Sequence, residues 1–345
     1  MAGSSPGAYT VHLHARTPEE LQTSRQRLAQ GELVTSKSQP GSSLPVHVQV
    51  GPAAAGKAGP GLDADAYFGA LQTRALGGVL LAAAELPSTQ TLLQDNAALV
   101  PDGAVAVANR QVAGKGRGQN RWTSPDGCLM FSVCTELDIS GVRLPFVQYV
   151  ASLAVVHAIQ EQARARLQGA SLDVRIKWPN DLYAGGLKLG GVLCHSVYRA
   201  RLFATVTGVG LNLANTEPTT CVDALIAARH AELALPGAAA PVPREALLAG
   251  IMGQLEAMLG VLAAQGFDSL QAAYLDAWLH SGQQVELEEH EGGDGAMRRV
   301  SLTVQGLTPG GYLLATDAAG KGFELHPDGN SLDFFQGLVR RKALQ

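Results

Sequence analysis

The stretch of sequence that first suggests chemistry is GKGRGQNRW, residues 114–122, in which Lys115, Arg117 and Arg121 fall within seven residues. The glycines between them let a backbone approach a ligand closely and adopt positive φ. Arg117 can form paired, charge-assisted bonds with a carboxylate or phosphate, and Lys115 adds a point charge. The pattern predicts an anion-binding loop. The same composition is also typical of a solvated turn, and the P-loop spacing GxxxxGK[ST] is absent.

A second cluster, KWPNDLYAGGLKLGG at residues 177–191, places two lysines around Asn180 and Asp181. Asn and Asp after proline often only build a turn, so a purely structural role stays open here. Lys188 stands at the start of an apolar strand. A lysine that points inward from such a strand needs an anionic partner, which makes this cluster a second candidate for anion chemistry.

The third motif is GVGLNL, residues 208–213, in which Gly208 and Gly210 alternate with apolar residues. Glycine in a strand lets a flat ligand or another backbone pack closely, and it is equally typical of a β-bulge. Asn212 is polar within an apolar run, so we expect it to have a hydrogen-bond partner. Taken together, the three motifs predict a pocket for a flat group and an anion, such as a nucleotide with an acid.

The overall composition limits the classes of protein to which these motifs can belong. Hydrophobic residues make up 46% of the 345 residues and charged residues 16%, so a sizeable packed core is possible. The net charge of −4 argues against a general nucleic-acid binder, because no broad basic face is available. The basic loop is therefore a local device.

Cysteine usage and the N-terminus bear on the compartment. The four cysteines are widely spaced without a CxxC pair, which argues against a zinc site or a disulfide framework and fits a reducing compartment. No run of residues approaches the ~20 apolar residues of a membrane span, and a signal-peptide core is missing. Residues 1–18 contain no Asp or Glu, a weak hint of a transit peptide that Glu19 and Glu20 offset.

The hydrophobic pattern predicts a mixture of helices and strands after residue 62. We expect strands at 79–86, 104–109, 128–137, 173–183, 187–198 and 203–214, the last two paired. Helices are expected at 18–30, from Ser88 or Thr89, and at 146–167, 244–264 and 267–279. Short runs split by Gly, Asp and Pro near the C-terminus indicate a small β-barrel or sandwich, with EGGDG (291–295) as a hairpin loop. The Gly/Pro/Ser-rich stretches at 36–43 and 51–61 indicate linkers.

Several of these segments resemble the motifs of one family, the biotin protein ligases. GKGRGQNRWTSPDGC resembles that family's GRGRxxNxWxSPxGC signature, and IKWPNDLYAGGLKLGGVL resembles its KWPNDxY…KxGGxL segment. ELPSTQTLL, GVGLNLANTEPTTC, YLDAWLHSGQ and ELHPDGNSLDFFQGLVRRK are similar to further elements in the expected order. The resemblance covers roughly residues 70–345 and is closer to the eukaryotic, plant-type members.

The resemblance implies an α+β fold, in which a catalytic domain like that of class II aminoacyl-tRNA synthetases precedes an SH3-like β-barrel. The implied division is a variable extension or linker at 1–62, a biotin- and ATP-binding domain at 63–270 and the C-terminal domain at 271–345. The implied activity is biotin–protein ligation. Biotin and ATP, with Mg²⁺, give biotinyl-5′-AMP, and the biotinyl group passes to a lysine of a carboxylase biotin-carrier domain.

The resemblance also assigns roles to individual residues of this sequence. Residues assigned to biotin are Ser88, Thr89, Gln90, Gln111, Lys115, Gly116, Arg117, Lys188, Gly191 and Gly208. Residues assigned to ATP or the adenylate are Gly114, Lys115, Gly116, Arg117, Trp122, Asn180, Lys188 and Asn212. Catalytic roles fall on Arg117, Lys188 and Asp181, with no metal held by side chains alone.

Some features depart from the family pattern or leave alternatives open. Lys115 stands where many members have arginine, so the bidentate contact of an arginine is replaced by the single charge of a lysine. Residues 1–62 show no helix-turn-helix, so no DNA-binding domain is expected, nor a membrane segment. We expect a monomer or weak homodimer in the cytoplasm, with plastid or mitochondrion as the alternative. A lipoate–protein ligase or a non-catalytic biotin-binding module remain the competing functions.

Overall fold

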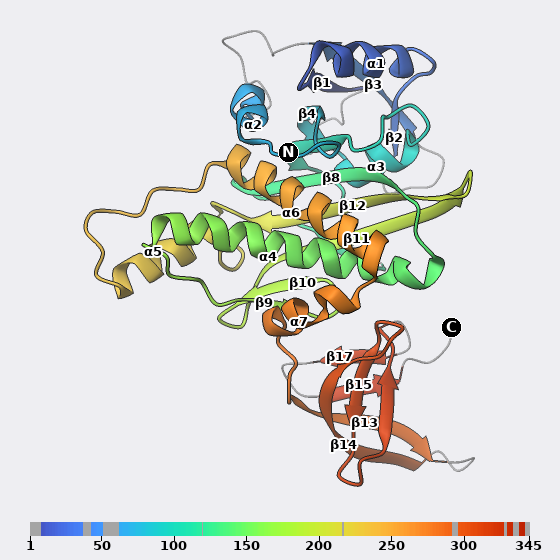
Figure 1. Cartoon of the computed structure of the whole chain (residues 1–345), viewed down its shortest axis with the longest axis vertical. Helices are drawn as coiled ribbons and strands as arrows, with labels where there is room; N and C mark the ends of the chain where they lie inside the picture. The colour runs from blue at the N-terminus through green and yellow to red at the C-terminus, as the bar shows by residue number, and fades with distance from the viewer. Residues whose placement is uncertain are drawn as a thin grey trace, which may run out of the picture.

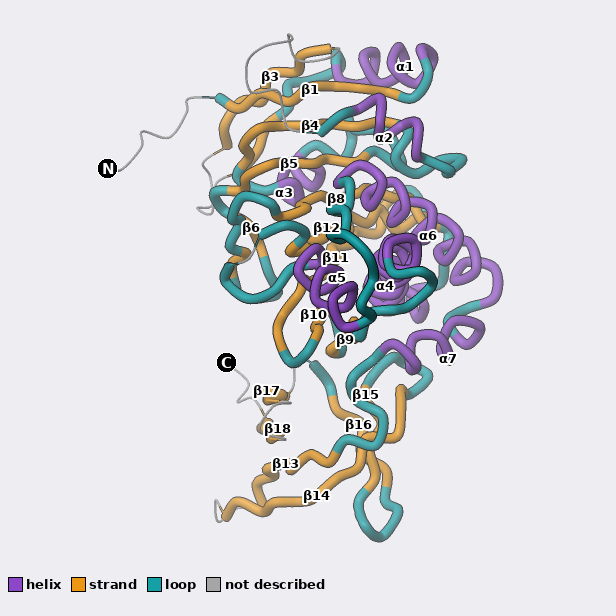
Figure 2. The backbone as a smooth tube through the Cα atoms, turned by 90° about the vertical axis from the view of Figure 1, so that its left-hand side faces the viewer, coloured by secondary structure: helices purple, strands orange, loops and turns teal. Residues whose placement is uncertain are grey.

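The computed structural model describes residues 8–36, 43–50, 62–118, 120–215, 217–291, 296–327, 330–333 and 338–341. Its largest element is a ten-stranded sheet with the order β2-β3-β1-β4-β5-β8-β12-β11-β10-β9 (Figures 1 and 2). The strands are β1 (Tyr9–Ala15), β2 (Val34–Ser36), β3 (Ser43–Val50), β4 (Val79–Leu86), β5 (Val105–Gln111), β8 (Cys128–Leu137), β9 (Val174–Lys177), β10 (Asp181–Ala184), β11 (Leu187–Arg199) and β12 (Leu202–Asn212).

Alternating side chains of the central strands build two cores, one on each face of this sheet. Leu80 and Ala82 of β4 belong to the core that contains the buried residues of α4 (Val147–Arg166) and α6 (Arg244–Gln265). Leu81 and Ala83, one position along, belong to the other core with α3 (Thr89–Asp95). Figure 1 shows α4 and α6 lying across the first face. The continuous apolar runs of the sequence therefore become strands that are buried on both sides.

Two helical segments, Gly141–Arg166 and Arg244–Gln265, are long and apolar enough to cross a membrane by length and composition alone. The expectation that no run approaches this length is wrong for these two segments. Both are core helices, since much of α4 and α6 is buried against the sheet and against each other. Their apolar character is explained by that packing.

The N-terminal residues contribute ordered structure to the main sheet. Strand β1 pairs antiparallel with β4, from Ala15 opposite Val79 to His12 opposite Ala82, and β3 adds to its other side. Helix α1 (Pro18–Leu28) begins where the sequence predicted, with Thr17 and Glu20 forming a capping box. The helix expected at 18–30 is confirmed as α1, residues 9–36 and 43–50 join the main sheet, and most of the two Gly/Pro/Ser-rich stretches lies outside the described residues.

The C-terminal residues form a second, smaller sheet with the order β16-β15-β14-β13-β18-β17. Its strands are β13 (Gln284–Glu291), β14 (Ala296–Leu307), β15 (Leu313–Thr316), β16 (Gly322–Leu325), β17 (Asn330–Asp333) and β18 (Leu338–Arg341). The expected EGGDG hairpin loop lies almost wholly outside the described residues, although β13 and β14 pair as a hairpin. The boundary expected at 270/271 falls within α7 (Asp268–Ala277), whose Tyr274 stacks on Tyr149 of α4.

Most of the elements expected after residue 62 are confirmed, including the paired β11 and β12. The expected strand 173–183 is two strands, β9 and β10, separated by the turn at Trp178–Asn180. Two helices went unpredicted, α2 (Ala64–Ala70) and α5 (Val222–Glu232). The remaining strands, β6 (Gly114–Lys115) and β7 (Arg121–Trp122), form a two-stranded ribbon within the basic loop.

Candidate active site

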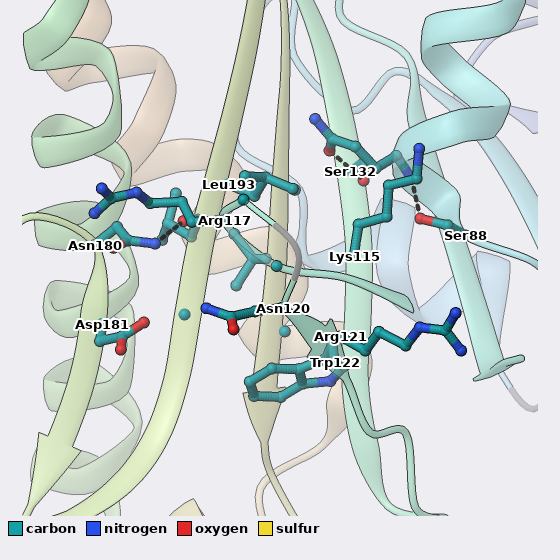
Figure 3. Close-up of a pocket in the computed structure, with 18 of the residues that line it drawn as sticks. Ser88, Lys115, Arg117, Asn120, Arg121, Trp122, Ser132, Asn180, Asp181 and Leu193 are labelled. Carbon is teal, nitrogen blue, oxygen red and sulfur yellow. Dashed lines mark hydrogen bonds between the residues drawn. The ribbon is translucent and has the colours of Figure 1, made fainter. Parts of the chain in front are cut away.

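A cleft of about 390 Å³ opens where α3, the basic loop and strands β8, β11 and β12 meet (Figure 3). Its lining also includes residues 177–181 and, from the C-terminal sheet region, Pro327. These segments are far apart in the sequence, and the main sheet brings them together because β8, β12 and β11 are adjacent strands. The cleft therefore joins all three motifs that the sequence singled out.

One end of the cleft is neutral and closely hydrogen-bonded; we call it the neutral end, formed by Ser88, Thr89, Gln90, Gln111 and Ser132. Ser88 caps α3 and accepts from the backbone N–H of Gln90 at 3.2 Å. Gln111 Oε1 accepts from the N–H of Thr89 at 2.7 Å. Ser132 lies 2.9 Å from the hydroxyl of Thr89 and donates to Gln90 Oε1 at 3.1 Å. Because these groups hold one another in place, the neutral end is preorganised for a polar, uncharged ligand group.

The glycines of β12 are required by what packs against them. A Cβ added to Gly208 would collide with Gln90 Oε1 and lie 3.1 Å from Ser132 Oγ. A Cβ on Gly210 would lie 2.6 Å from Trp122 Cε2. Both positions must stay without a side chain, since the cleft floor lies at the backbone of β12. Side chains pack closely over Gly208 and Gly210, and the expected packing of a flat ligand there stays a prediction.

The other end carries charge; we call it the charged end, formed by Asn180, Asp181 and Lys188. Lys188 Nζ lies 2.8 Å from Asp181 Oδ2, and the two side chains are 39% and 26% exposed. Asn180 Nδ2 donates to the carbonyl of Val192 at 2.7 Å, which ties the turn to β11. Asp181 lies opposite Gly191 in the pairing of β10 with β11. The expected anionic partner of Lys188 is thus Asp181. Because both side chains are partly exposed, a ligand anion can replace Asp181 as the partner of Lys188.

The basic loop covers the cleft between these two ends. In Figure 3 Lys115 extends toward Ser88 and Ser132, whereas Arg117 lies beside Asn180. Arg117 also donates to the carbonyl of Pro327 at 3.5 Å. The indole of Trp122 lies on the backbone of Gly210. Two of the loop's cations, Lys115 and Arg117, therefore lie toward opposite ends of one cleft.

The side chains that line the cleft supply mainly positive charge. Burial raises the pKa of Cys128 and Cys134 to about 12, and neither thiol lines the cleft. Among the residues that the structure describes, no group of three His, Cys, Asp or Glu is placed to hold a metal ion. Five cleft-lining cations, Lys115, Arg117, Arg121, Lys177 and Lys188, stand against the single carboxylate of Asp181 within the described part of the lining. Such a site favours an anionic ligand.

Comparison with known proteins identifies the family. The model of the biotin/lipoate A/B protein ligase family matches residues 82–212. The chain is 43% identical over 277 residues to biotin–protein ligase 2 of Arabidopsis thaliana, covering 80% of this chain and 81% of the relative. The chain belongs to the biotin–protein ligase family.

Two further comparisons place the chain within this family. It is 42% identical to the chloroplastic biotin–protein ligase 1 of A. thaliana, over 80% of this chain and 72% of the relative. The structure of the biotin protein ligase of Aquifex aeolicus in complex with biotin and ATP superposes with a TM-score of 0.53 at 22% identity. That superposition covers 70% of this chain and 92% of the other, and it supports the same fold. The α+β fold with the synthetase-like catalytic domain is thereby confirmed.

Most residues that the family resemblance singled out line the cleft, and two do not. Asn212 is 4% exposed and lies behind the lining, where its Nδ2 donates to Thr219 Oγ1 at 3.1 Å and to the carbonyl of Lys188 at 3.4 Å. Gly114 pairs with Trp122 in the ribbon of the loop. Asn212 supports the backbone of Lys188 and Gly114 supports the loop, and their contact with ATP stays a prediction.

Several lining residues were not assigned to the site from the sequence, notably Ser132, Lys177, Trp178 and Gly210. Ser132 carried a usable signal, since it is a polar residue within the apolar run of β8 and is fully buried. Gly210 was noticed as a glycine but was not assigned to the site. Trp178 stood within the second motif, but its place in the wall depends on contacts with Tyr149, His280 and Gly311, which are 29 to 133 positions away.

Proposed function

We propose that this protein is a biotin–protein ligase that activates biotin with ATP to biotinyl-5′-AMP and then transfers the biotinyl group to a lysine of a biotin-carrier domain. The observation that carries the proposal is one cleft with a preorganised neutral end and a half-exposed Lys188–Asp181 pair. The family to which the chain belongs and its relatives named biotin–protein ligase support it.

In this proposal the neutral end receives the uncharged ring system of biotin. Ser88, Thr89, Gln90 and Gln111 offer hydroxyl and amide groups whose positions are fixed before the ligand arrives. Gly208 and Gly191 leave room along the strands for the flat ring and its chain. Lys115 and Gly116 close over this part of the cleft.

The charged end would neutralise the reacting anions. The carboxylate of biotin is already ionised at neutral pH, so its attack on the α-phosphorus of ATP needs no general base. It needs compensation of charge, because one anion approaches another, and Lys188 and Arg117 supply positive charge there. Trp122 and Asn180 would contact the adenylate. A Mg²⁺ ion would be held mainly by the phosphates of ATP, and Asp181 is the carboxylate of the described lining that could join them.

The basic loop would retain the reactive intermediate. A mixed anhydride hydrolyses easily, so a loop that excludes water protects it until transfer. Replacing Arg117 by alanine should release free biotinyl-AMP into solution, which chromatography of a single-turnover reaction detects. Retention of the intermediate at the wild-type level would remove the role of the loop.

Asp181 would assist the second step, which requires a neutral lysine amine. Its carboxylate can accept or orient the proton of that amine. In Asp181→Asn, transfer to a carrier domain should slow more than pyrophosphate release does. If carrier transfer were untouched in this variant, Asp181 would have no part in the step.

The test of the whole proposal is transfer of labelled biotin to an isolated carboxylase carrier domain, with and without ATP. We expect ATP-dependent labelling of one lysine with biotin and none with lipoate. Labelling with lipoate, or biotin binding without pyrophosphate release, would favour the competing functions. We further propose a monomer or weak homodimer that acts in the cytoplasm or in a plastid, in line with the chloroplastic name of one relative.

A further inference from the structure

Trp178 connects the wall of the cleft to the C-terminal sheet region. This residue is 2% exposed, and it lines the cleft together with Pro179. It stands between Lys177, the last residue of β9, and the residues of the charged end. Its polar contacts therefore bear on how that end is positioned.

The indole of Trp178 is hydrogen-bonded to two partners on different elements. Nε1 donates to the hydroxyl of Tyr149, on α4, at 2.8 Å and lies 3.3 Å from the carbonyl oxygen of Gly311. The hydroxyl of Tyr149 in turn donates to the same Gly311 carbonyl at 2.5 Å. Gly311 lies in the turn between β14 and β15 of the C-terminal sheet. One carbonyl of that sheet is thus shared by two buried donors of the catalytic domain.

The backbone of Trp178 is held separately by His280. The N–H of Trp178 donates to His280 Nε2 at 2.9 Å, so that nitrogen must be unprotonated. The other ring nitrogen, Nδ1, lies 2.8 Å from Gln283 Oε1 and carries the proton in this arrangement. His280 is fully buried between α7 and β13, and burial lowers its pKa to about 4. The imidazole is therefore neutral and able to accept at physiological pH.

Close packing makes this arrangement stiff. A Cβ on Gly311, whose φ is +82°, would lie 3.2 Å from Phe146 Cε1 and from Tyr149 Cε2, so the turn approaches the rings as closely as glycine allows. Tyr149 stacks on Tyr274 with ring centroids 5.1 Å apart. Aromatic residues make up only 5% of the chain, and their concentration here indicates a junction selected for rigid packing.

We propose that Tyr149, His280 and the Gly311 carbonyl form a latch on Trp178, through which the C-terminal domain positions the charged end of the cleft. The inference rests on the proposed function. Fixing Trp178 fixes the turn that follows it, and the carboxylate of Asp181 holds Lys188 Nζ. Tyr149 and His280 are positioning residues, since neither lines the cleft. The neutral end lies on α3, β5 and β8, outside the latch.

The experiment compares two tyrosines of the same aromatic cluster. Tyr149→Phe removes the shared hydroxyl, whereas Tyr274→Phe removes a buried hydroxyl that has no hydrogen-bond partner among the described residues. We expect Tyr149→Phe to lower kcat for biotin- and ATP-dependent pyrophosphate release about tenfold, with the Kd of biotin unchanged within about twofold. The indole ¹H–¹⁵N resonance of Trp178 should shift as well. Tyr274→Phe should leave all three quantities near wild type.

Variants of His280 provide a second, independent test of the latch. His280→Gln can place an amide oxygen near the position of Nε2, so it should retain more of kcat than His280→Leu, which removes the acceptor. Equal behaviour of Tyr149→Phe and Tyr274→Phe, or an equal loss of biotin binding and kcat in Tyr149→Phe, would overturn the latch.

The latch and the proposed function fail in different ways. If the wild-type protein releases no pyrophosphate, the proposed function fails. The latch is then judged by the amide resonances of Lys177, Trp178, Asn180 and Asp181, which must move in Tyr149→Phe and stay fixed in Tyr274→Phe. Unmoved resonances would overturn it.

Discussion

The two ends of the cleft are built from the same sheet but by opposite physical means. At the neutral end, buried uncharged groups satisfy one another, so their geometry exists before a ligand binds. At the charged end, Lys188 and Asp181 are partly exposed and pair with each other, so a ligand must compete with an existing contact. The contrast suggests that the rigid neutral end recognises the ligand. The reaction would then take place at the charged end, where charged groups can exchange partners.

Replacing Lys188 should give the largest difference between the effect on pyrophosphate release and the effect on biotin binding. In Lys188→Ala we expect pyrophosphate release to slow about 100-fold, because positive charge is lost where the reacting anions meet. The Kd of biotin should change by less than about threefold, since the neutral end is intact. Single-turnover release and equilibrium binding measure the two quantities. Lys321→Ala, an exposed lysine of the C-terminal sheet, is the matched control. Equal losses in rate and binding would remove the division between the ends.

The pH dependence of stability tests the buried support of the charged end. The pKa of His280 is about 4 in the folded protein and near 6.5 in the unfolded chain, because burial disfavours the charged form. The stabilisation is complete above pH 6.5 and is lost as pH falls from 6.5 toward 4, where only the unfolded chain takes up the proton. The difference corresponds to about 3 kcal/mol of unfolding free energy. Urea unfolding between pH 7 and 4 measures it.

His280→Gln isolates this contribution from other titrating groups, such as His14 and His157, whose pKa values burial also lowers. The difference between the wild-type and variant curves should shrink with falling pH. Parallel curves would show that His280 does not supply the dependence.

Removing the hydroxyl of Ser132 should give the opposite signature to Lys188→Ala. Ser132 links Thr89 and Gln90, and the lost hydrogen bonds correspond to about 1–2 kcal/mol. We expect the affinity for biotin to fall about tenfold in Ser132→Ala, with kcat at saturating biotin little changed. Isothermal titration and steady-state kinetics measure the two. Ser301→Ala, an exposed serine of β14, serves as the control. A fall in kcat with unchanged affinity would contradict the rigid-end argument.

The elements of the site could be predicted from the sequence where local patterns decide them. Apolar runs located β4, β5, β8, β11 and β12, and the N-cap at Ser88 located α3. The strand β1 was missed although Tyr9, Val11 and Leu13 alternate as buried residues, because its partner β4 is more than 60 positions away and Gly/Pro/Ser-rich stretches follow it. A local pattern shows which face of a strand is apolar, but not which strand it joins.

The supports of the site were the least predictable part. The family resemblance assigned Asn212 to ATP, whereas its place in an apolar run predicted a hydrogen-bond partner, which is confirmed. In the structure its amide is used within the protein, and only the register of β11 with β12 reveals that it faces the carbonyl of Lys188. The same holds for His280 and Gly311, which meet Trp178 across 102 and 133 positions. Such residues do not contact the ligand themselves, so no sequence motif identifies them.

The smallest expected effect comes from Thr219, which supports the charged end from behind. Its hydroxyl donates to the carbonyl of Lys188 at 2.6 Å and accepts from Asn212 Nδ2. Thr219→Val keeps the shape of the side chain and removes both contacts, leaving a buried amide donor less well satisfied. We expect kcat for pyrophosphate release to fall about threefold to fivefold with biotin affinity unchanged. Thr303→Val, whose hydroxyl accepts from Gln284 in the C-terminal sheet, is the matched control. Because Thr219 does not line the cleft, a change in biotin affinity without a change in kcat would mean that the two ends are coupled through β11 and β12 rather than built separately.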